Sequence, residues 1–579
     1  MESEQIEIMI DGRSVKAQAG KSILEAAAAA NIEIPALCHH PDLAVRANCR
    51  ICVVEIVGEK GVVPACATKI RQGMQIITDN DRLRALRKTN LELIMSQHRE
   101  ECADCVWLAE CRLLKYVTQF KAKIDRFSDR KKKFATYKFG PIEFDRSKCI
   151  DCRNCVEICS RQQANFLELK NKGFRTVIEP SYDPKKDCIY CGQCIVHCPV
   201  GAIEAVGEFE EIRNLLADKK KVMVVQFAPS IRASIGEAAG MPYGSVVTGQ
   251  LVAGLKKLGF NKVFDVSTAA DFTTIEEAEE LVDRISQKKI LPMFTSCCPA
   301  WVKYVEFYRP DLIPNLTSVK SPQNMLGSLI KTYWAQKEKI DPRNIVVVSI
   351  MPCTAKKYEI EKPEARINGL KPIDTVLTTR ELGRLFRLNK IDLKSLKAES
   401  ADDPLGVHTG AGVIYGATGG VMESAIRTAY WRLTGKNMAD LACTSVRGIV
   451  GFKKAQVKIG DLTLKAAVAN GMENAKLILD ELAEDPKAYD YIEIMACPGG
   501  CIGGGGQPLP VSDEIRKKRA QALYQIDCEK EVRVAHENPQ VLKIYDDFFA
   551  KDQKKIHHIL HTRYKQKQKS RIATIRQKD

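Results

Sequence analysis

The sequence predicts a multidomain protein that combines α+β and α/β units. The chain has 579 residues, far beyond the size at which a single hydrophobic core keeps growing. It contains 22 cysteines, and those that precede residue 200 fall into groups with the spacing of metal ligands. From about Lys219 apolar strands alternate with helical segments, which is typical of parallel sheets covered by helices. We therefore expect small metal-binding domains followed by a larger α/β domain.

Residues 1–80 predict a small sheet with one helix. The stretch "IEIMI" alternates apolar and polar residues, Asp11-Gly12 is a turn signal, and "SVKAQA" returns as the second strand of a hairpin. A helix is expected at "SILEAAAAANI". Four cysteines follow with the spacing C-x10-C-x2-C-x13-C: Cys38, Cys49, Cys52 and Cys66. This arrangement resembles plant-type 2Fe-2S ferredoxin domains of the β-grasp fold, although the first gap is longer than their usual one. The resemblance implies one 2Fe-2S cluster.

Residues 81–126 predict a small helical domain with a second metal site. A helical segment from about Arg82 to Gln97 leads into "HREECADCVWLAEC". The spacing H-x3-C-x2-C-x5-C sets one histidine in register with three cysteines: His98, Cys102, Cys105 and Cys111. A lone histidine is usually structural, but here it is the natural fourth ligand. Zinc is the alternative metal, and the neighbouring iron-binding motifs favour a 4Fe-4S cluster.

Residues 127–208 carry the strongest local signal. The runs "CIDCRNCVEICS" and "CIYCGQCIVHCP" both read C-x2-C-x2-C-x3-C, the pattern of bacterial two-cluster ferredoxins. In that pattern the last cysteine of each run serves the other cluster. One 4Fe-4S cluster is therefore assigned to Cys149, Cys152, Cys155 and Cys198, and the second to Cys159, Cys188, Cys191 and Cys194. The neighbouring His39, His40 and His197 receive no role.

Residues 209–579 predict a catalytic α/β domain. Three strands end in cysteine, "KILPMFTSCC", "NIVVVSIMPC" and "YIEIMACPGGC", and a fourth, "KVMVVQFAPS", ends in a Pro-Ser pair. Sites form beyond the carboxyl ends of strands in open α/β sheets, so these loops are expected to converge on one pocket. The glycines of "CPGGCIGGGGQP" allow close approach of a bulky inorganic group. The loops contain five thiols, whereas a 4Fe-4S cube takes four.

The motifs "TSCCPAW", "MPCTAKKYE" and "MACPGGCIGGGGQP", in this order behind the cluster modules, resemble the three signatures of iron-only (FeFe) hydrogenases. The resemblance covers essentially the whole chain. It implies two sheets flanked by helices around an H-cluster, which is a 4Fe-4S cube joined to a two-iron unit with CO, cyanide and a bridging dithiolate amine. The implied reaction is the reversible conversion of 2 H+ and 2 e− to H2, with electrons relayed through four accessory clusters.

The same resemblance implies roles for individual residues. The cube ligands are Cys298, Cys353, Cys497 and Cys501, with Cys501 also bridging to the two-iron unit. The cyanides are hydrogen-bonded by Lys356 and Ser230, and the pocket is lined by Pro229, Gln323, Met351, Met495 and Tyr415. A proton path consists of Cys297, Glu277, Thr317, Glu280 and Arg284. Thr317 stands where a relay serine is expected, and the alternative interpretations are a packed, inert Cys297 and a purely structural capping box of Thr274 with Glu277.

Charge and hydropathy narrow the functional classes. The formal charge is +16, from 88 Lys and Arg against 72 Asp and Glu. Because thiolate-bound clusters are net anions, part of this excess balances them, and nucleic acid is not an expected partner. No apolar run approaches the ~20 residues that cross a bilayer, and the N-terminus lacks a signal pattern, so we expect a cytoplasmic protein without membrane insertion. The basic stretch 126–138 and the tail from Lys551 predict either a solvated face or a docking surface for an acidic electron carrier.

The expected partners follow from this interpretation. They are a ferredoxin or flavodoxin-like carrier and the maturation proteins that insert the two-iron unit. An NAD(P)H-linked flavin subunit is a further candidate, because the chain has no nucleotide-binding glycine motif of its own. Two alternatives stay open at this point: an electron-transfer subunit like that of respiratory NADH dehydrogenases, and a hydrogen sensor or assembly-type homologue with a weakened site. Cys443 and Cys528 lie outside every motif.

Overall fold

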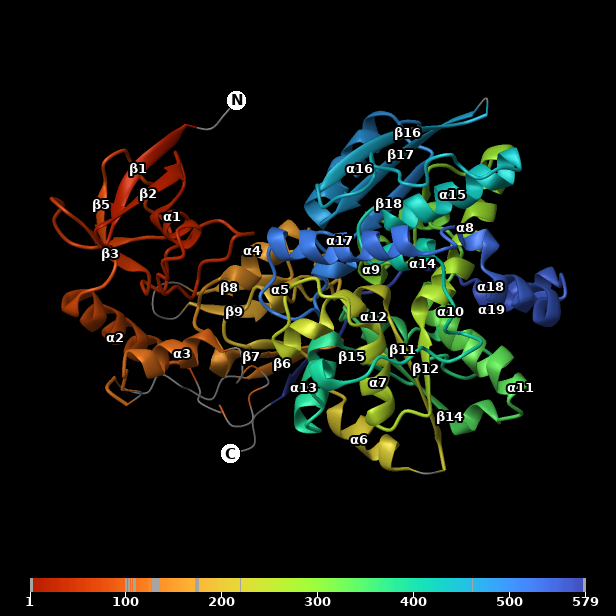
Figure 1. Cartoon of the computed structure of the whole chain (residues 1–579), viewed down its shortest axis with the longest axis horizontal. Coiled ribbons are helices and arrows are strands. Elements are labelled where there is room, and N and C mark those ends of the chain that lie inside the picture. The colour runs from red at the N-terminus through yellow and green to blue at the C-terminus, as the bar shows by residue number, and fades with distance from the viewer. Residues whose placement is uncertain are drawn as a thin grey trace.

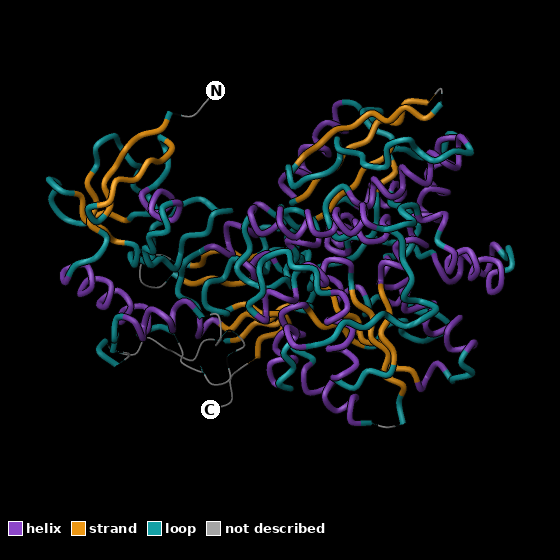
Figure 2. The backbone as a smooth tube through the Cα atoms, in the orientation of Figure 1, coloured by secondary structure: helices purple, strands orange, loops and turns teal. Residues whose placement is uncertain are grey.

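The computed structural model describes residues 4–98, 102, 105, 107, 111–123, 125–127, 135–171, 176–218, 220–460 and 462–575. An N-terminal lobe, drawn in red in Figure 1, is followed by the cluster-binding region and then by a larger body that contains the rest of the chain. Figure 2 shows two separate groups of strands within this body, with helices around and between them.

The N-terminal lobe contains a five-stranded sheet of order β2-β1-β5-β3-β4. Its strands are β1 (Gln5–Ile10), β2 (Arg13–Gln18), β3 (Val53–Ile56), β4 (Val63–Pro64) and β5 (Gln75–Ile77). β1 and β2 form the predicted antiparallel hairpin, and β5 pairs parallel to β1. Helix α1 (Ile23–Ala29) lies within the predicted range, and a capping box between Ser22 and Glu25 starts it.

Helix α2 (Asp81–Met95) confirms the predicted helical segment, and it is hydrogen-bonded to the N-terminal lobe. Its buried Arg87 donates hydrogen bonds to the carbonyl oxygens of Ile51, Val53 and Thr78. The guanidinium thus satisfies backbone acceptors on the loop and strand that follow Cys49 and on the residue that follows β5. Helix α3 (Arg112–Gln119) begins directly after Cys111, which is its N-cap residue.

The two-cluster region reproduces its sequence repeat in the backbone. Helices α4 (Asn154–Arg161) and α5 (Gln193–Val196) each follow a left-handed residue, Arg153 at φ 67° and Gly192 at φ 70°. Asp151 and Tyr190, two residues earlier in each run, are also left-handed. The same turn therefore presents each set of cysteines. Strands β8 (Leu167–Lys170) and β9 (Val177–Pro180) form a hairpin beside it.

The C-terminal tail returns to this region. Strands β6 (Thr136–Phe139), β7 (Ile142–Asp145), β10 (Ile203–Ala205) and β19 (Ile572–Ile575) form one antiparallel sheet of order β10-β7-β6-β19. Lys569 Nζ donates to the carbonyl oxygens of Ser181, Asp183 and Lys186. The tail from Lys551 is therefore only in part a solvated face, because carbonyl acceptors hold Lys569 and backbone pairing holds β19. Residues 128–134 of the other basic stretch lie outside the described residues.

The large body contains two sheets. The first, of order β12-β11-β14-β15, is parallel throughout; its strands are β11 (Val222–Phe227), β12 (Lys262–Asp265), β14 (Ile345–Met351) and β15 (Thr375–Thr378). The second has the order β13-β18-β17-β16, from β13 (Met293–Phe294), β16 (Phe452–Ile459), β17 (Leu462–Asn470) and β18 (Tyr491–Met495). Only β16 runs antiparallel, because it is joined to β17 by a short hairpin connection. The strands that were predicted to end in cysteine are β13, β14 and β18.

Helices cover both sheets. Helix α8 (Val266–Ser286) packs against α10 (Pro322–Leu329), α14 (Gly410–Ile414) and α15 (Gly420–Thr434). The remaining helices are α6 (Phe209–Ala217), α7 (Thr248–Lys257), α9 (Pro299–Tyr308), α11 (Ala335–Lys337), α12 (Ala355–Glu359), α13 (Thr379–Leu388), α16 (Met472–Glu484), α17 (Asp513–Glu529), α18 (Pro539–Ile544) and α19 (Gln553–Leu560). Among the residues that the structure describes, no helix has the length and apolar character needed to cross a membrane.

Candidate active site

Five cysteines from distant parts of the chain line one cavity between the two sheets. Cys297 and Cys298 follow β13, Cys353 follows β14, and Cys497 and Cys501 follow β18. Six of the other predicted pocket residues line the same cavity: Pro229, Gln323, Met351, Lys356, Tyr415 and Met495. The carboxyl ends of strands from both sheets meet here, which is where α/β folds assemble sites.

The donor set in this cavity fits an iron-sulfur cube. Burial, followed by the nearby Cys298, raises the pKa of the Cys353 thiol to about 12, and burial likewise raises the pKa of Cys497. Four crowded thiols in an apolar cavity cannot ionise without a metal, and iron supplies the positive charge that makes them thiolates. The backbone N–H of Ala496 already points at Cys298 Sγ over 3.5 Å, the kind of hydrogen bond that tunes cluster sulfurs.

Lys356 brings a buried cation to the cavity wall. Its Nζ donates to the carbonyl oxygen of Cys297 over 3.1 Å and pairs with Glu359 Oε2 over 2.9 Å. Burial opposes the charge, but Glu359 more than offsets this and raises the pKa of Lys356 above its ordinary value. The cavity therefore offers a fixed ammonium group to anionic ligands.

Ser230 and Gln323 are buried polar residues that differ in their position relative to the cavity. Ser230 is fully buried and does not line the cavity; its Oγ accepts a hydrogen bond from Gln507 Nε2 over 3.3 Å. Gln323 does line the cavity, and its Nε2 donates to Glu359 Oε2 over 3.0 Å. The buried Oε1 of Gln323 has no hydrogen-bond partner among the described residues.

Glu277 is the buried carboxyl of the predicted proton path. It lies on α8 and is 1% exposed, and its Oε1 accepts a hydrogen bond from Tyr491 over 2.8 Å. Its Oε2 has no partner within the described residues. Burial raises the pKa of Glu277 to about 8, with further contributions from Glu280 and Glu493. A carboxyl with a pKa near neutrality suits proton exchange. The predicted capping box with Thr274 does not form, because α8 already begins at Val266 and Thr274 lies in its interior.

Glu280, one turn along α8, is held by four groups. Thr317 Oγ1 donates to its Oε2 over 2.8 Å, and both the Ser318 N–H and the Ser318 hydroxyl donate to the same oxygen over 2.9 Å. Arg284 Nη2 donates to Oε1 over 2.6 Å. Burial opposes ionisation, but Arg284 and these hydrogen bonds hold the pKa of Glu280 below its usual range. Thr317 thus retains the hydroxyl contact that a serine would make.

Cys297 and Tyr415 line the cavity at the end of the predicted proton path that is nearest to the cube ligands. Burial raises the pKa of Cys297, and the nearby Glu277 carboxyl adds to the effect. Tyr415 lies 5% exposed, with its hydroxyl 2.9 Å from Thr274 Oγ1. Thr274 in turn donates to the carbonyl oxygen of Ala270, so the tyrosine is tied to α8.

The two-cluster region touches the active-site loops directly. Gln193 Nε2 donates to the carbonyl oxygen of Gly503 over 3.0 Å, and Cys497 Sγ lies 3.8 Å from the carbonyl oxygen of Cys191. A Cβ at Gly505 would lie 2.5 Å from that same carbonyl oxygen and 2.6 Å from Gly192 Cα. Only glycine permits this backbone approach, which sets a predicted ligand of one cluster beside a predicted ligand of the next.

The eight cysteines of the two-cluster region group across the repeat. After burial, the largest influences that raise the pKa of Cys152 come from Cys198 and Cys149, and those on Cys188 come from Cys194 and Cys159. Cys198 is thus near cysteines of the first run and Cys159 near cysteines of the second, which agrees with the exchanged assignment, while the ligand set itself stays a prediction. Backbone N–H groups also point at the sulfurs, for example from Phe166 and Leu167 to Cys159 Sγ.

The four cysteines of the N-terminal lobe form two pairs. A contact with Cys38 lowers the pKa of Cys49 to about 6, and a contact with Cys66 lowers the pKa of Cys52. Two thiols for each of two irons is the donor set of a 2Fe-2S cluster. All 22 cysteines, which the structure describes, are free thiols.

His98, the predicted histidine ligand of the second metal site, is buried against the two-cluster region. It is 8% exposed, and its Nδ1 lies 2.8 Å from the carbonyl oxygen of Lys148. A carbonyl acceptor at Nδ1 favours the tautomer that carries its proton there, which is the tautomer of a histidine that binds a metal through Nε2. Cys105 and Cys102 lie close enough to affect the pKa of Cys111. Several residues between His98 and Cys111 lie outside the described part of the chain.

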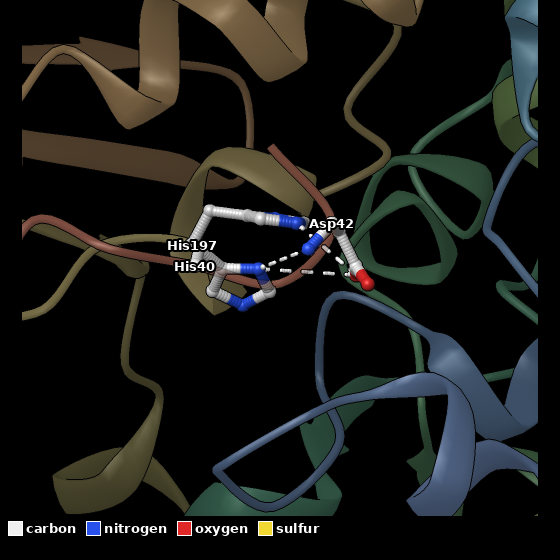
Figure 3. Close-up of side chains that lie close together, drawn as sticks. All are labelled: His40, Asp42 and His197. Carbon is white, nitrogen blue, oxygen red and sulfur yellow. Dashed lines mark hydrogen bonds and ion pairs between the residues drawn. The ribbon is translucent and has the colours of Figure 1, made fainter. Parts of the chain in front are cut away.

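His40, Asp42 and His197 form a cluster at a domain junction (Figure 3). Asp42 Oδ2 lies 3.5 Å from His197 Nε2 and 4.0 Å from His40 Nδ1, and the two rings are 4.1 Å apart. Arg516 on α17 donates to both Asp42 oxygens, over 2.9 and 2.7 Å. The guanidinium neutralises the carboxylate and would repel a metal ion, so this cluster is better explained as an ionic junction between three regions.

Several site residues were missed in the sequence. Glu359 could have been found, because it stands three residues after Lys356 on a short helix and such positions are neighbours. Tyr491, Ser318 and Gln507 carry no comparable signal, since each reaches its partner only through tertiary folding.

The fold and site together define an iron-sulfur oxidoreductase with a buried, thiol-lined catalytic centre. Residues 221–505 match the family described as iron only hydrogenase large subunit, C-terminal domain, and residues 513–567 match the iron hydrogenase small subunit. Residues 3–81 match a 2Fe-2S iron-sulfur cluster binding domain, and residues 148–202 match a 4Fe-4S dicluster domain.

Individual proteins agree with these matches. The chain is 40% identical to the NADP-reducing hydrogenase subunit HndD of Solidesulfovibrio fructosivorans, over 97% of this chain and 99% of that protein. It is 38% identical to iron hydrogenase 1 of Clostridium pasteurianum, over 96% and 99%. A solved structure of the [FeFe]-hydrogenase HydA(deltaEFG) is 39% identical and covers 62% of this chain and 98% of its own, with a TM-score of 0.56. The chain belongs to the iron-only (FeFe) hydrogenases.

Proposed function

We propose that this hydrogenase interconverts 2 H+, 2 e− and H2 at an H-cluster held by Cys298, Cys353, Cys497 and Cys501. The observation that carries the proposal is the convergence of five cysteines from three distant strands on one cavity, with Lys356 in its wall. When bound, the H-cluster supplies the redox centre and, through its bridging amine, the immediate base for H2. The chain supplies the ligands, the fixed charge, the dry surroundings and the proton path.

The pocket residues have distinct roles in this proposal. The Lys356 ammonium, kept charged by Glu359, faces anionic ligands of the two-iron unit. Ser230 lies outside the cavity lining, and its proposed contribution is the hydroxyl that accepts a hydrogen bond from Gln507 Nε2. The apolar side chains of Pro229, Met351 and Met495 exclude water, which strengthens each electrostatic contact within the cavity. Gln323 and Tyr415 complete the wall.

Protons enter and leave through side chains. Cys297 is the thiol left over when four others bind the cube, and it exchanges protons at the inner end of the path. Glu277 accepts from it, and Glu280 passes the proton on under the control of Thr317 and Arg284. A thiol is far easier to ionise than a hydroxyl, which is the chemical reason for a cysteine at this position.

Electrons travel through four accessory clusters, one 2Fe-2S and three 4Fe-4S, one of them with His98 as ligand. In this proposal they occupy domains at 1–80, 81–126 and 127–208, and residues 209–579 form the catalytic domain. The contact between the Cys191 carbonyl oxygen and Cys497 Sγ supports the second 4Fe-4S cluster of the two-cluster region as the last electron carrier before the cube.

The proposed electron partner is a ferredoxin or flavodoxin-like carrier in the cytoplasm. The name of the NADP-reducing relative favours an added NAD(P)H-linked flavin subunit. Maturation proteins would insert the two-iron unit.

Substitution of the adjacent cysteines tests the division of labour. Cys297→Ala should assemble the cluster, with near-normal infrared bands of CO and cyanide, but lose H2 evolution and uptake by roughly 10²-fold or more, because the inner proton carrier is gone. Cys298→Ala should instead damage assembly, because a cube ligand is lost. Retained turnover in Cys297→Ala, or identical assembly defects in the two variants, contradicts the assignment. A weak rate in the native chain itself would favour a sensor.

A further inference from the structure

A hydrogen-bonded chain runs outward from Glu280 through residues that the proposed path does not include. Ser318 Oγ donates to Glu280 Oε2 over 2.9 Å and also lies 2.9 Å from His561 Nδ1. His561 Nε2 lies 2.9 Å from Glu276 Oε2. Every link falls within the distance over which protons transfer along hydrogen bonds.

Main-chain hydrogen bonds fix the position of His561 beside Ser318. His561 forms an antiparallel bridge with Val319, and Thr562 N–H donates to the carbonyl oxygen of Ser318 over 2.7 Å. On the other side of the bridge, Lys320 N–H donates to the carbonyl oxygen of Leu560, the last residue of α19, over 2.8 Å. The C-terminal segment and the 317–320 segment are thus paired by main-chain bonds, so the imidazole is preorganised rather than free to swing.

The outer end of the chain reaches solvent. His561 lines a surface groove together with Glu276, Glu280 and Asp283, and its side chain is 11% exposed. His557 stacks on the ring, with centroids 4.7 Å apart and an interplanar angle of 3°. Glu276 is further held by a hydrogen bond from Tyr545. The groove therefore gives the imidazole contact with water while its orientation is fixed.

We propose that His561 is a proton-relay residue that connects Glu280 to solvent; this rests on the proposed role of Glu280 in the proton path. In one state, neutral His561 carries its proton on Nε2 and Ser318 donates to Nδ1, while Glu280, which holds a proton only transiently because its pKa is low, donates to Ser318. Two protons then shift, from Glu280 Oε2 to Ser318 Oγ and from Ser318 Oγ to His561 Nδ1. Glu280 becomes a carboxylate, Ser318 remains a hydroxyl that now donates to Glu280, and His561 becomes an imidazolium. It releases its Nε2 proton to Glu276 or to water in the groove. The ring returns to its first tautomer by exchange with water, and H2 uptake and evolution use the same steps in opposite directions.

The test compares His561→Ala and His561→Gln in the matured enzyme at low buffer concentration. Both variants should lower H2 evolution from reduced methyl viologen about tenfold, because glutamine keeps hydrogen bonds to Ser318 and Glu276 but carries no exchangeable imidazole proton. Added imidazole should restore most of the His561→Ala rate. The infrared bands of CO and cyanide should stay unchanged, and the carboxyl band of Glu280 should shift in the redox difference spectrum.

Matched controls separate this inference from the proposed function. His558→Ala removes a neighbouring exposed histidine that takes no part in the hydrogen-bonded relay. Its Nε2 lies 3.0 Å from Asn368 Oδ1, and the variant should keep the native rate. Glu280→Gln should be nearly inactive and unaffected by imidazole. Two results would overturn the His561 relay and leave the proposed path through Glu280 intact. In both, Glu280→Gln is inactive, while His561→Ala either keeps the native rate or is slow and not restored by imidazole. If Glu280→Gln is fully active, the proposed path itself fails.

Discussion

At the scale of single residues, Glu277 is a carboxyl whose protonation depends on its burial in the folded chain. Burial raises its pKa from 4.5 to about 8, so the folded chain holds a proton there that the unfolded chain has lost. The resulting stabilisation is fully present below about pH 4.5 and is lost as the pH rises towards about 8.

Glu277→Gln should remove this dependence. The native melting temperature should fall relative to that of the variant between about pH 5 and about pH 9, since glutamine carries no charge to bury. The variant should also lose roughly 10²-fold of H2 turnover, because it cannot exchange protons. Calorimetry across this range and a hydrogen assay check both parts. A pH-independent difference in melting temperature together with full activity would return Glu277 to a structural role.

His98 allows a second test at this scale. If it binds iron through Nε2 while Nδ1 faces the Lys148 carbonyl, His98→Ala should lose one reduced-cluster signal in electron paramagnetic resonance and about four irons per chain. The infrared bands of the catalytic cluster should not change. His98→Cys, which keeps a ligand, is the matched control and should retain the iron. An unchanged set of signals in His98→Ala argues against ligation.

At the scale of elements, the decisive contact is between the loop before α5 and the glycine-rich loop after β18. Gly505→Ala would drive a Cβ into the Cys191 carbonyl and Gly192, at a cost of about 1–3 kcal/mol. Relief of this clash separates the two loops, so ferredoxin-driven H2 evolution should fall several-fold while H2/D2 exchange, which needs no external electrons, should change less. Gly207→Ala, where nothing lies within 4 Å of the new Cβ, should behave as native. Equal losses in both assays would place the damage in the active site.

Strand ends were the part of the fold that the sequence predicted best. An apolar strand that stops at cysteine has both a hydrophobic and a chemical signal, as β14 and Cys353 illustrate. The antiparallel strand β16 and the pairing of β19 with β6 had neither a hydrophobic nor a chemical signal. Each pairing depends on a partner strand that the local sequence does not identify. For the same reason the sequence indicated Glu280 and Thr317 by resemblance but not Ser318 or His561.

At the scale of the whole molecule, the C-terminal tail links the catalytic body to the two-cluster region. Residues 513–567 match a family described as a small subunit, and here they are continuous with the catalytic domain. After α19 the tail supplies His561, then Lys569 and finally β19. One covalent segment thus contacts both the outer end of the proposed proton relay and the two-cluster region, which ties these two parts of the molecule together.

The proposed H-cluster in the five-cysteine cavity can be detected by the infrared spectrum of the chain after anaerobic maturation, because CO and cyanide bound to iron give stretching bands in a spectral window that proteins leave clear. We expect such bands in the native chain and in Cys297→Ala, and their loss or disturbance in Cys353→Ala. A matured native chain with intact accessory clusters by electron paramagnetic resonance, but without CO or cyanide bands, would contradict the proposal.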